Sequence, residues 1–334
     1  MPPADPNELQ KSRLISRVLH LYYMEERSQA EIARLLGLST AGVNRLLKAA
    51  RQQGLVEIKI NLPHQHIFDL ETRLAQTAGL QRAVVVPHLD GSPQTLLAAV
   101  GQAGAALLSE QLRGGDTVCI SGGRTVASLV EALAPQPPCP DVHFVPALGG
   151  VQGRHYTDVN NLAAELARKT GGSAYQLHAP AFADTPAERD ALCALRQVSE
   201  VLERARRARI ALVGVGSLQP EDASYFYFTA LADDERRQLL QRAQPVAEIL
   251  ARLIDSRGQP CAPELDRRVV GMDLDDLRRI PLVIGIAADA QKVQPILAAL
   301  RGGYLDALVT DEDTARAVLA QLSTSPPVSE RNNQ

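Results

Sequence analysis

A short glycine-containing stretch, SGGRT at 121–125, combines residue types suited to binding an anion. Gly122 and Gly123 let the backbone approach a ligand closely, the Thr125 hydroxyl can hydrogen-bond to it, and Arg124 adds a positive charge. The stretch follows an apolar run and opens an amphipathic one, so it would aim the N–H groups of a helix N-terminus at the ligand. We expect these four residues to bind an anion; a plain connection between strand and helix is the alternative.

A lysine in the C-terminal part of the chain predicts a second anion contact. Lys292 follows the apolar run PLVIGIAAD and stands just inside the next amphipathic segment. The positive end of a helix dipole repels an ammonium group unless an anion lies between them, so we expect Lys292 to bind a phosphate group. A solvated surface lysine is the alternative.

Three further stretches stand where apolar runs end. Gly149 and Gly150 follow one run, and we expect them at the same ligand site. Asp255 follows another run and either binds a ligand hydroxyl or initiates the turn after it. GVGS at 214–217 resembles part of a dinucleotide-binding fingerprint, but it lacks the third glycine and the downstream partner, which excludes that cofactor.

These stretches belong to a regular alternation of apolar runs and amphipathic segments that starts at Arg82. Such alternation predicts a doubly wound α/β domain, with a largely parallel sheet covered by helices on both faces. Ligands bind at the carboxyl ends of the strands in such sheets, where the glycines and Lys292 would lie. The expected strands are AVVVP, DTVCIS, VHFVPAL, AYQLHAP, IALVGVG, PLVIGIAAD and DALVTD, and the expected helices are 95–112, 125–133, 160–170, 190–209, 292–300 and 314–322.

The segment 28–54 has the spacing of a helix-turn-helix. Ala33 is small enough for two helices to approach closely, Gly37 can adopt the positive φ of the turn, and Val43 would anchor the second helix in the core. The helix start signals are two N-cap residues and a capping-box partner: Ser28, Ser39 and Glu31.

The polar face of the second helix is rich in hydrogen-bond donors, as contact with base edges and phosphates requires. It predicts binding to double-stranded DNA through Ser39, Thr40, Asn44, Arg45, Lys48 and Arg51. A further apolar stripe predicts a third helix over 12–25, and the alternation in GLVEIKIN, 54–61, is typical of the wing of a winged helix. An ordinary αα-hairpin is the alternative.

Composition limits the remaining possibilities. The first 60 residues contain 9 basic and 6 acidic side chains, whereas the rest of the chain contains 26 and 32, so only the N-terminal part suits nucleic acid. No run approaches the ~18 to 20 apolar residues of a membrane span, and the four cysteines form no C-x-x-C pair. We expect a cytoplasmic protein with no cofactor, metal or membrane contact.

The order of elements predicts the domain boundaries. We expect a DNA-binding domain over 1–62, a linker over 63–81, an α/β domain over 82–324 and a disordered tail over 325–334. His64 and His66 in the linker lack further metal ligands nearby, which favours a solvated segment. The stripe Ile67, Leu70, Leu74 and Ala78 is either the first core helix of the α/β domain or a dimer contact.

Two other classes of function are considered. A sugar-phosphate isomerase or deaminase would need a base poised for proton transfer. Asp255, Asp311 and Glu312 are acidic candidates, while His155 and His178 have no evident partner, so we expect no catalytic residue. A purely structural protein would leave the anion-binding stretches unused.

The order of the motifs LLKAARQQGLVEIKI, SGGRT, LGG, HAPAF, ALVGVGS and RGGYLDALVTDEDTA resembles the SorC family of bacterial sugar-responsive transcriptional regulators. The resemblance covers nearly the whole chain. It implies an effector-binding domain related to ribose-5-phosphate isomerase and glucosamine-6-phosphate deaminase, in a dimer or tetramer. It also implies that the effector is a phosphorylated sugar or, in one branch of the family, phosphorylated autoinducer-2.

The resemblance assigns roles to individual residues. The family's glycine-threonine loop corresponds to Gly122, Gly123 and Thr125, its acidic effector contact to Asp255 and its phosphate lysine to Lys292.

The chain departs from the family's pattern at two places. It has AQPVAEILARLID where a glycine-rich, acid-containing stretch is usual, and Ala287, Ala288 and Asp289 where glycines usually precede the lysine. Alanine Cβ atoms would narrow the approach to a phosphate and Asp289 would repel it, which predicts an unusual effector or a reduced affinity.

Overall fold

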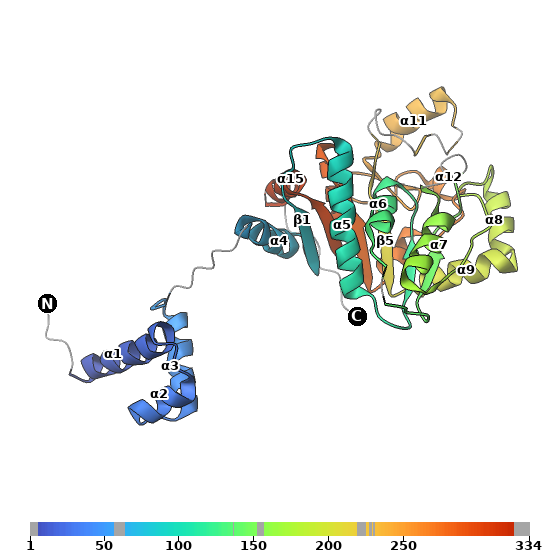
Figure 1. Ribbon diagram of the computed structural model, residues 1–334. Coiled ribbons are helices and arrows are strands. Elements are labelled where there is room, and N and C mark those ends of the chain that lie inside the picture. The colour runs from blue at the N-terminus through green and yellow to red at the C-terminus, as the bar shows by residue number, and fades with distance from the viewer. Residues whose placement is uncertain are drawn as a thin grey trace. The chain divides into compact units, whose positions relative to one another are not determined.

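The computed structural model describes residues 6–56, 64–135, 137–151, 157–218, 225–226, 229 and 231–323. These residues divide into two compact units, Met1–Pro63 and His64–Gln334. Figure 1 shows a small helical unit and a larger α/β unit. The expected tail, His155 and all but the first three residues of the expected wing lie outside the described residues.

The first unit contains the expected helix-turn-helix. Helix α2, Gln29–Leu36, and helix α3, Thr40–Gln52, follow α1, Pro6–Leu19. The helix expected over 12–25 differs in two ways. It begins earlier, at Pro6, and after the α-helix α1 its last turn, His20–Met24, is a π-helix.

Local hydrogen bonds fix the ends of α2 and α3. The Ser28 hydroxyl accepts from the Glu31 N–H at 3.3 Å, and the Glu31 carboxylate accepts from the Ser28 N–H at 2.9 Å, so the predicted capping box is present. Gly37 ends α2 with φ +65°, in the left-handed region, and Ser39 caps α3. A core common to the three helices buries Val18, Leu21, Ile32, Ala33, Val43 and Leu47.

A seven-stranded, wholly parallel sheet forms the centre of the second unit, as the alternation predicts. The strand order is β1-β10-β9-β5-β2-β3-β4. The strands are β1 Arg82–Val86, β2 Thr117–Ile120, β3 His143–Pro146, β4 Ser173–Ala174, β5 Ile210–Gly214, β9 Leu282–Ile286 and β10 Ala307–Asp311.

Helices cover both faces of this sheet because successive side chains of each strand point to opposite faces. In β2, Val118 and Ile120 pack against α5 Pro93–Gln111, α6 Arg124–Ala132 and α7 Val159–Thr170. Cys119 belongs to the core on the other face. That face packs against α4 Gln65–Ala78, α9 Arg196–Arg206, α14 Val293–Arg301 and α15 Glu312–Ser323.

Helix α4 belongs to the α/β unit. Its stripe Ile67, Leu70, Leu74 and Ala78 is buried in the core, as one of the two alternatives predicts. These four side chains are therefore not available for a contact between copies of the chain.

Two predicted elements differ in the structure. The strand expected over AYQLHAP is limited to β4, because the Asn160 side chain takes over the pairing of Leu177: Oδ1 accepts from its N–H at 2.8 Å and Nδ2 donates to its carbonyl at 3.3 Å. The helix expected over 190–209 is divided at Leu195, whose extended backbone separates α8, Pro186–Ala194, from α9.

A small antiparallel sheet was not predicted. It contains β6 Gly216–Ser217, β7 Ala247–Ile249 and β8 Arg252–Ile254, in that order. Leu250 and Ala251 connect β7 to β8 with φ of +52° and +63°, and two positive φ values at the centre of a two-residue hairpin loop match the twist of the strands. The remaining helices are α11 Asp233–Ala243, α12 Pro263–Asp266 and α13 Leu274–Arg278.

The chain order of the large sheet reverses between β2 and β5. From β2 the chain continues through β3 to β4 at one edge, and from β5 it continues through β9 to β10 in the other direction. The connections after β2 and β5 therefore diverge, leaving a crevice at the carboxyl ends of the two strands.

Helices α5 and α6 pack closely enough that a glycine is required between them. A Cβ atom added at Gly101 would lie 2.3 Å from the Ser128 hydroxyl oxygen and 2.6 Å from the Ser128 carbonyl oxygen. The absence of a side chain at Gly101 therefore sets the position of α6, which starts at the crevice.

Gly101→Ala is expected to lower the free energy of unfolding by about 2 kcal/mol, although alanine is the better helix former, because the added methyl group overlaps backbone atoms. Chemical denaturation measures this change. Gly114→Ala is the control, since its Cβ would meet only the Cys139 sulfur at 4.0 Å, and a change within about 0.5 kcal/mol is expected. Equal effects of the two substitutions would contradict the close-packing argument.

Candidate functional site

A cavity of about 420 Å³ lies at the carboxyl ends of the strands, at the reversal of strand order. The connections after β2, β3, β5 and β9 and the hairpin β7–β8 line it. Its volume is in the range of small-molecule sites, about 300 to 1,000 Å³, and a reversal of strand order is where open α/β sheets bind ligands.

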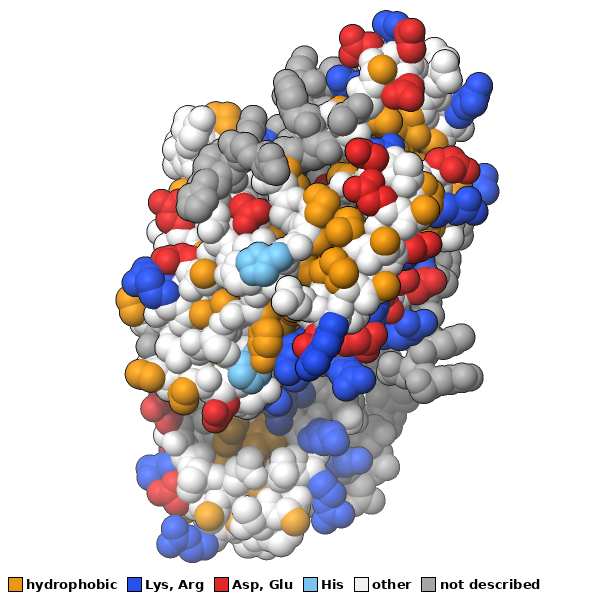
Figure 2. Space-filling view, turned by 90° about the vertical axis from the view of Figure 1, so that its right-hand side faces the viewer, with side chains coloured by type: hydrophobic (Ala, Val, Ile, Leu, Met, Phe, Trp, Pro, Cys, Tyr) orange, Lys and Arg blue, Asp and Glu red, His pale blue; other side chains and the backbone are white. Residues whose placement is uncertain are grey.

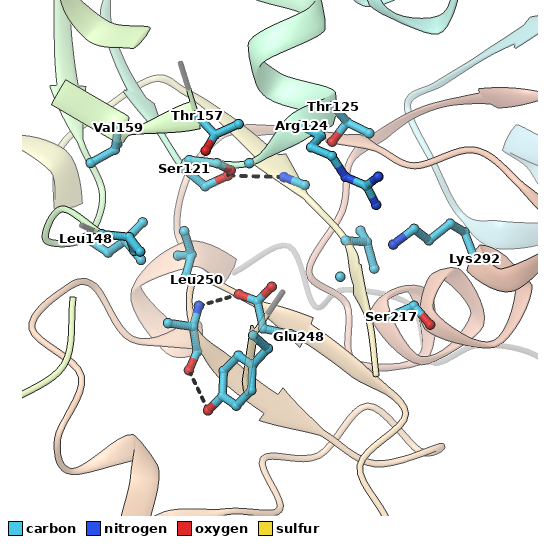
Figure 3. A pocket seen from close by; sticks show the side chains of 18 of the residues that line it. Ser121, Arg124, Thr125, Leu148, Thr157, Val159, Ser217, Glu248, Leu250 and Lys292 are labelled. Atoms are coloured by element: carbon cyan, nitrogen blue, oxygen red, sulfur yellow. Dashed lines mark hydrogen bonds between the residues drawn. The ribbon is translucent and has the colours of Figure 1, made fainter. Parts of the chain in front are cut away.

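The connection from β2 to α6 forms one wall. The Ser121 hydroxyl accepts from the Gly214 N–H at 3.2 Å and donates to the Gly122 carbonyl at 3.0 Å, so it joins the ends of β2 and β5 (Figure 3). Gly123 stands at the N-cap of α6 with φ +112° and has no side chain to cap the helix. The start of α6 therefore presents the positive end of its dipole to the cavity.

Two cationic side chains belong to the described lining. Arg124 lies in the first turn of α6, and Lys292 lies at the end of a 3₁₀ turn, Ala290–Lys292, that leads into α14. In Figure 3 the two charged groups point from different elements toward the same part of the cavity. An anionic ligand group placed there would meet both cations and the start of α6.

An acidic side chain faces these cations. Glu248 of β7 lines the cavity, and its carboxylate accepts from the Ala251 N–H at 2.5 Å. Burial raises the pKa of Glu248 above its ordinary value, while the Ala251 hydrogen bond and the charge of Lys292 act in the opposite direction. A carboxylate in this position is suited to accept hydrogen bonds from ligand hydroxyls.

An apolar wall completes the cavity. The rings of Phe182 and Tyr225 meet edge to face at 5.8 Å, and the Tyr225 hydroxyl donates to the Ala251 carbonyl at 3.4 Å. Leu148 and Leu250 extend this surface. The cavity thus pairs a charged side with an apolar side, as sites for small polar ligands do.

Six of the eight residues expected to bind the effector line this cavity: Gly122, Gly123, Arg124, Thr125, Gly149 and Lys292. Gly149 also has a packing role, because a Cβ there would lie 2.2 Å from the Pro180 carbonyl oxygen.

Gly150 and Asp255, the other two, do not line this cavity, so their expected contacts with the effector stay predictions. The Asp255 carboxylate accepts from the N–H groups of Arg257 and Gln259 at 2.8 and 2.9 Å, so it stabilises the turn, as its alternative interpretation states. Gly150 lies close to Asp158, whose Oδ2 would be 2.9 Å from an added Cβ.

The three residues that replace the usual glycines have different positions. Ala287 is buried in the core, whereas Ala288 and Asp289 line the cavity. Of these three residues, only Ala288 and Asp289 are placed to contact a ligand in the cavity.

The candidate catalytic bases have structural partners. Asp311 accepts from the Asp289 N–H at 2.8 Å and from the Thr314 N–H at 3.0 Å, and Glu312 accepts from the His88 N–H at 3.0 Å. His178 is exposed and does not line the cavity. These groups do not form an acid–base pair at the site.

The helix-turn-helix presents a polar face. All six residues expected to contact DNA are exposed, and Arg51 also donates from Nε to the Leu47 carbonyl at 3.4 Å. The buried side of α3 carries Val43, Leu47 and Ala50. The division into a polar and an apolar face is what a recognition helix requires.

On the face of the α/β unit seen in Figure 2, both basic and acidic side chains are present. None of the helices in the described part of the chain is long and apolar enough to span a membrane. Within the same residues, no three His, Cys, Asp or Glu side chains are grouped as metal ligands.

Comparison with known families agrees with this division. A family model described as a sugar-binding domain matches residues 63–320, and a MarR family model matches residues 7–63. The chain belongs to the SorC family of sugar-responsive, DNA-binding transcriptional regulators.

Individual relatives cover almost the whole chain. The sorbitol operon regulator of Klebsiella pneumoniae is 32% identical over 309 residues, 92% of this chain and 98% of the relative. The transcriptional regulator LsrR of Enterobacter sp. (strain 638) is 30% identical over 314 residues, 93% and 94% of the two chains. The crystal structure of the full-length K. pneumoniae regulator SorC superimposes with a TM-score of 0.73, over 93% of this chain and 99% of that one.

These relatives are transcriptional regulators and not enzymes, which decides against the isomerase or deaminase alternative. The α/β unit of this family member is thus a sugar-responsive sensor attached to a DNA-binding unit.

Sequence reasoning missed several residues of the cavity. Glu248 is the principal omission, since the acidic contact was expected at Asp255. One signal was available: Glu248 is the single charged residue within the apolar run VAEIL. Tyr225, Phe182 and Asp158 carry no comparable signal, because long-range folding brings them to the cavity.

Glu248→Gln is expected to raise the free energy of unfolding of the ligand-free protein by about 1 kcal/mol at pH 8, because it removes a desolvated charge and keeps an acceptor for Ala251. A carboxyl group whose pKa is raised on folding weakens stability as pH rises above its unfolded pKa, so the gain should shrink toward pH 5. Denaturation at both pH values measures it. Glu200→Gln, at an exposed ion pair with Arg196, should change stability by less than about 0.5 kcal/mol; an equal gain there would refute the burial argument.

Proposed function

We propose that the cavity binds a phosphorylated sugar or sugar-like effector, and that binding changes the arrangement of a homo-oligomer and its affinity for operator DNA. The observation that carries this proposal is the convergence of Arg124, Lys292 and the start of α6 on one part of the cavity. A phosphate group there would be balanced by two cations and a helix dipole, while Glu248 would accept from the sugar hydroxyls.

The coupling to DNA follows from symmetry. A dimeric helix-turn-helix protein places two recognition helices about 34 Å apart, one turn of DNA. An effector that binds one arrangement of the subunits more tightly shifts the population toward it, by its difference in binding free energy. We infer that the protein acts as a dimer or a tetramer on DNA in the cytoplasm. We also infer that the residues after α3 form the wing of the DNA-binding unit.

Arg45→Ala is expected to weaken operator binding by about 1 to 3 kcal/mol, because Arg45 is exposed on α3 and a bidentate contact with a base has this value. Fluorescence anisotropy with a mapped operator measures the change. Arg242→Ala in α11 removes a positive charge outside the DNA-binding unit and should leave binding unaltered. If Arg45→Ala also binds normally, base readout belongs to Asn44 or Lys48.

Lys292→Ala is expected to abolish the stabilisation of the protein by its effector and to leave ligand-free DNA binding intact, since the lysine lies in the cavity of the other unit. Thermal melting against a panel of phosphorylated sugars identifies the effector, and the same melts with the variant measure the loss. Arg196→Ala, an exposed cation outside the cavity lining, is the matched control and should respond like the wild type.

Two results would decide against this role of Lys292. An unchanged melting shift in Lys292→Ala at saturating effector would place the anion site elsewhere. Loss of DNA binding without effector would make the lysine structural. A turnover of the effector by the wild-type protein would support the enzyme alternative.

A further inference from the structure

Asp289 adopts a backbone conformation that only glycine enters without strain. Its φ is +101° and its ψ is 147°, whereas residues with a Cβ atom almost never occupy this region. Hydrogen bonds hold it there: its N–H donates to Asp311 Oδ2 at 2.8 Å, and its carbonyl accepts from the Lys292 N–H at 2.8 Å. An acidic side chain is thus kept at a strained position on the cavity wall, where glycine would be tolerated freely.

The carboxylate of Asp289 occupies the place at which this helix start would hold an anion. Its Oδ1 accepts from the Gln291 N–H at 3.2 Å, so it caps the 3₁₀ turn that precedes α14. The start of α6 differs, since its N-cap is Gly123 and contributes no acceptor side chain. A ligand anion would therefore meet an α6 start that has no capping side chain, with the negative charge of Asp289 in the same cavity.

The other described charges of the lining do not remove this repulsion. Asp158 caps α7 by accepting from Asn160 and Asn161 at 3.0 and 3.4 Å, and Glu248 adds a second acid beside Lys292. Two cations thus face three acids. A phosphate with two negative charges is disfavoured here relative to one with a single charge.

Protonation of the phosphate changes the interaction from repulsive to attractive. A monoanionic phosphate ester carries one P–OH group, and an ionised carboxylate is an acceptor for its proton. We propose that Asp289 selects the singly charged form of the effector's phosphate by accepting a hydrogen bond from its protonated oxygen. This rests on the proposed function of the cavity and names the charge state that it binds.

The selection makes binding dependent on pH. The proton comes from solution with the ligand, so affinity should rise as pH falls from about 8 to about 6, across the second ionisation of phosphate. Arg124, Lys292 and Asp158 share the lining with Asp289, and the carboxylates of Asp158 and Asp311 accept hydrogen bonds from backbone N–H groups. Burial raises the pKa of Glu248, so its protonation would also favour anions at low pH, and a control for the protein's own groups is required.

Sulfate supplies this control, because it has the shape of phosphate, keeps two charges across the pH range and has no proton to donate. Thermal melts of the full-length protein with each anion, at pH 6 and pH 8 and at constant ionic strength set with sodium chloride, give the two affinities. The phosphate probe is methyl phosphate, a monoester whose dianion at pH 8 has no proton left to donate. We expect wild-type protein at pH 6 to bind methyl phosphate about tenfold more tightly than sulfate, and to lose most of this preference at pH 8.

Asp289→Asn tests the carboxylate itself, because an asparagine oxygen still caps Gln291 while the charge is removed. We expect the preference for phosphate over sulfate at pH 6 to fall about tenfold, mainly through tighter sulfate binding. Asp275→Asn, at an exposed acid outside the lining, should keep the wild-type preference. Asp289→Gly removes cap and charge together, so it should lower the preference as Asp289→Asn does.

The outcomes separate this inference from the function on which it rests. If Lys292→Ala abolishes the response to both anions but Asp289→Asn leaves their ratio unchanged, the selection by Asp289 is refuted and the anion site stands. If neither anion stabilises the wild-type protein, both fail. If only Asp289→Gly changes the ratio, Asp289 acts as a helix cap and not through its charge, which also refutes the proposal.

Discussion

The hydroxyl group of Ser121 links the two strand ends between which the order of the sheet reverses. It accepts from the N–H of Gly214, the last residue of β5, and donates to the carbonyl of Gly122 after β2, so both strand ends are held where their chains diverge. The crevice exists because parallel strands leave in opposite directions at this point. Once it is fixed, α6 must start at its wall, and Gly101 allows α6 to lie close enough to α5 to do so. The cavity is therefore a consequence of topology, and the side chains on it determine which ligand fits.

Two of those side chains lower the stability of the folded protein. The Glu248 carboxylate is desolvated by burial, and the backbone of Asp289 is strained. Both residues line the cavity together with Lys292. Burying a charge and holding a residue in a rare backbone conformation each lower stability. A ligand that binds the folded state alone offsets such losses, by an amount that grows with the logarithm of its concentration relative to its Kd. Thermal melting is a sensitive assay for this reason.

Local signals explain what the sequence predicted, and long-range contacts explain what it did not. Ser28 and Glu31 are three residues apart, and the Gly37 N–H donates to the Ala33 carbonyl four residues earlier. The caps and the turn of the helix-turn-helix are therefore predictable from short stretches of sequence. The parallel strands are predictable because their buried apolar runs alternate with amphipathic helices. Asn160, 17 residues away in sequence, bonds the backbone of Leu177 in place of a neighbouring strand. Local sequence patterns do not predict such a contact. Glu248 has a local signal, a charge within an apolar run, but its place in the cavity depends on residues from the ends of β2, β5 and β9, which the sequence does not show as its neighbours.

A continuous set of contacts connects the cavity wall with the helix that follows the DNA-binding unit in sequence. Asp289 donates to the Asp311 carboxylate, which caps α15 through Thr314, and α15 packs against α4. Helix α4 in turn holds the edge of the sheet, since Glu71 accepts from the Val85 N–H at 2.8 Å. Contact alone transmits nothing unless the effector prefers one of two arrangements of these elements. Converting a population from 1:99 to 99:1 takes a preference of about 10⁴-fold, so a regulator of this design needs effector contacts that differ strongly between its two states. The charged groups beside Asp289, at the start of that set of contacts, can supply so large a difference because their energies change steeply with small displacements.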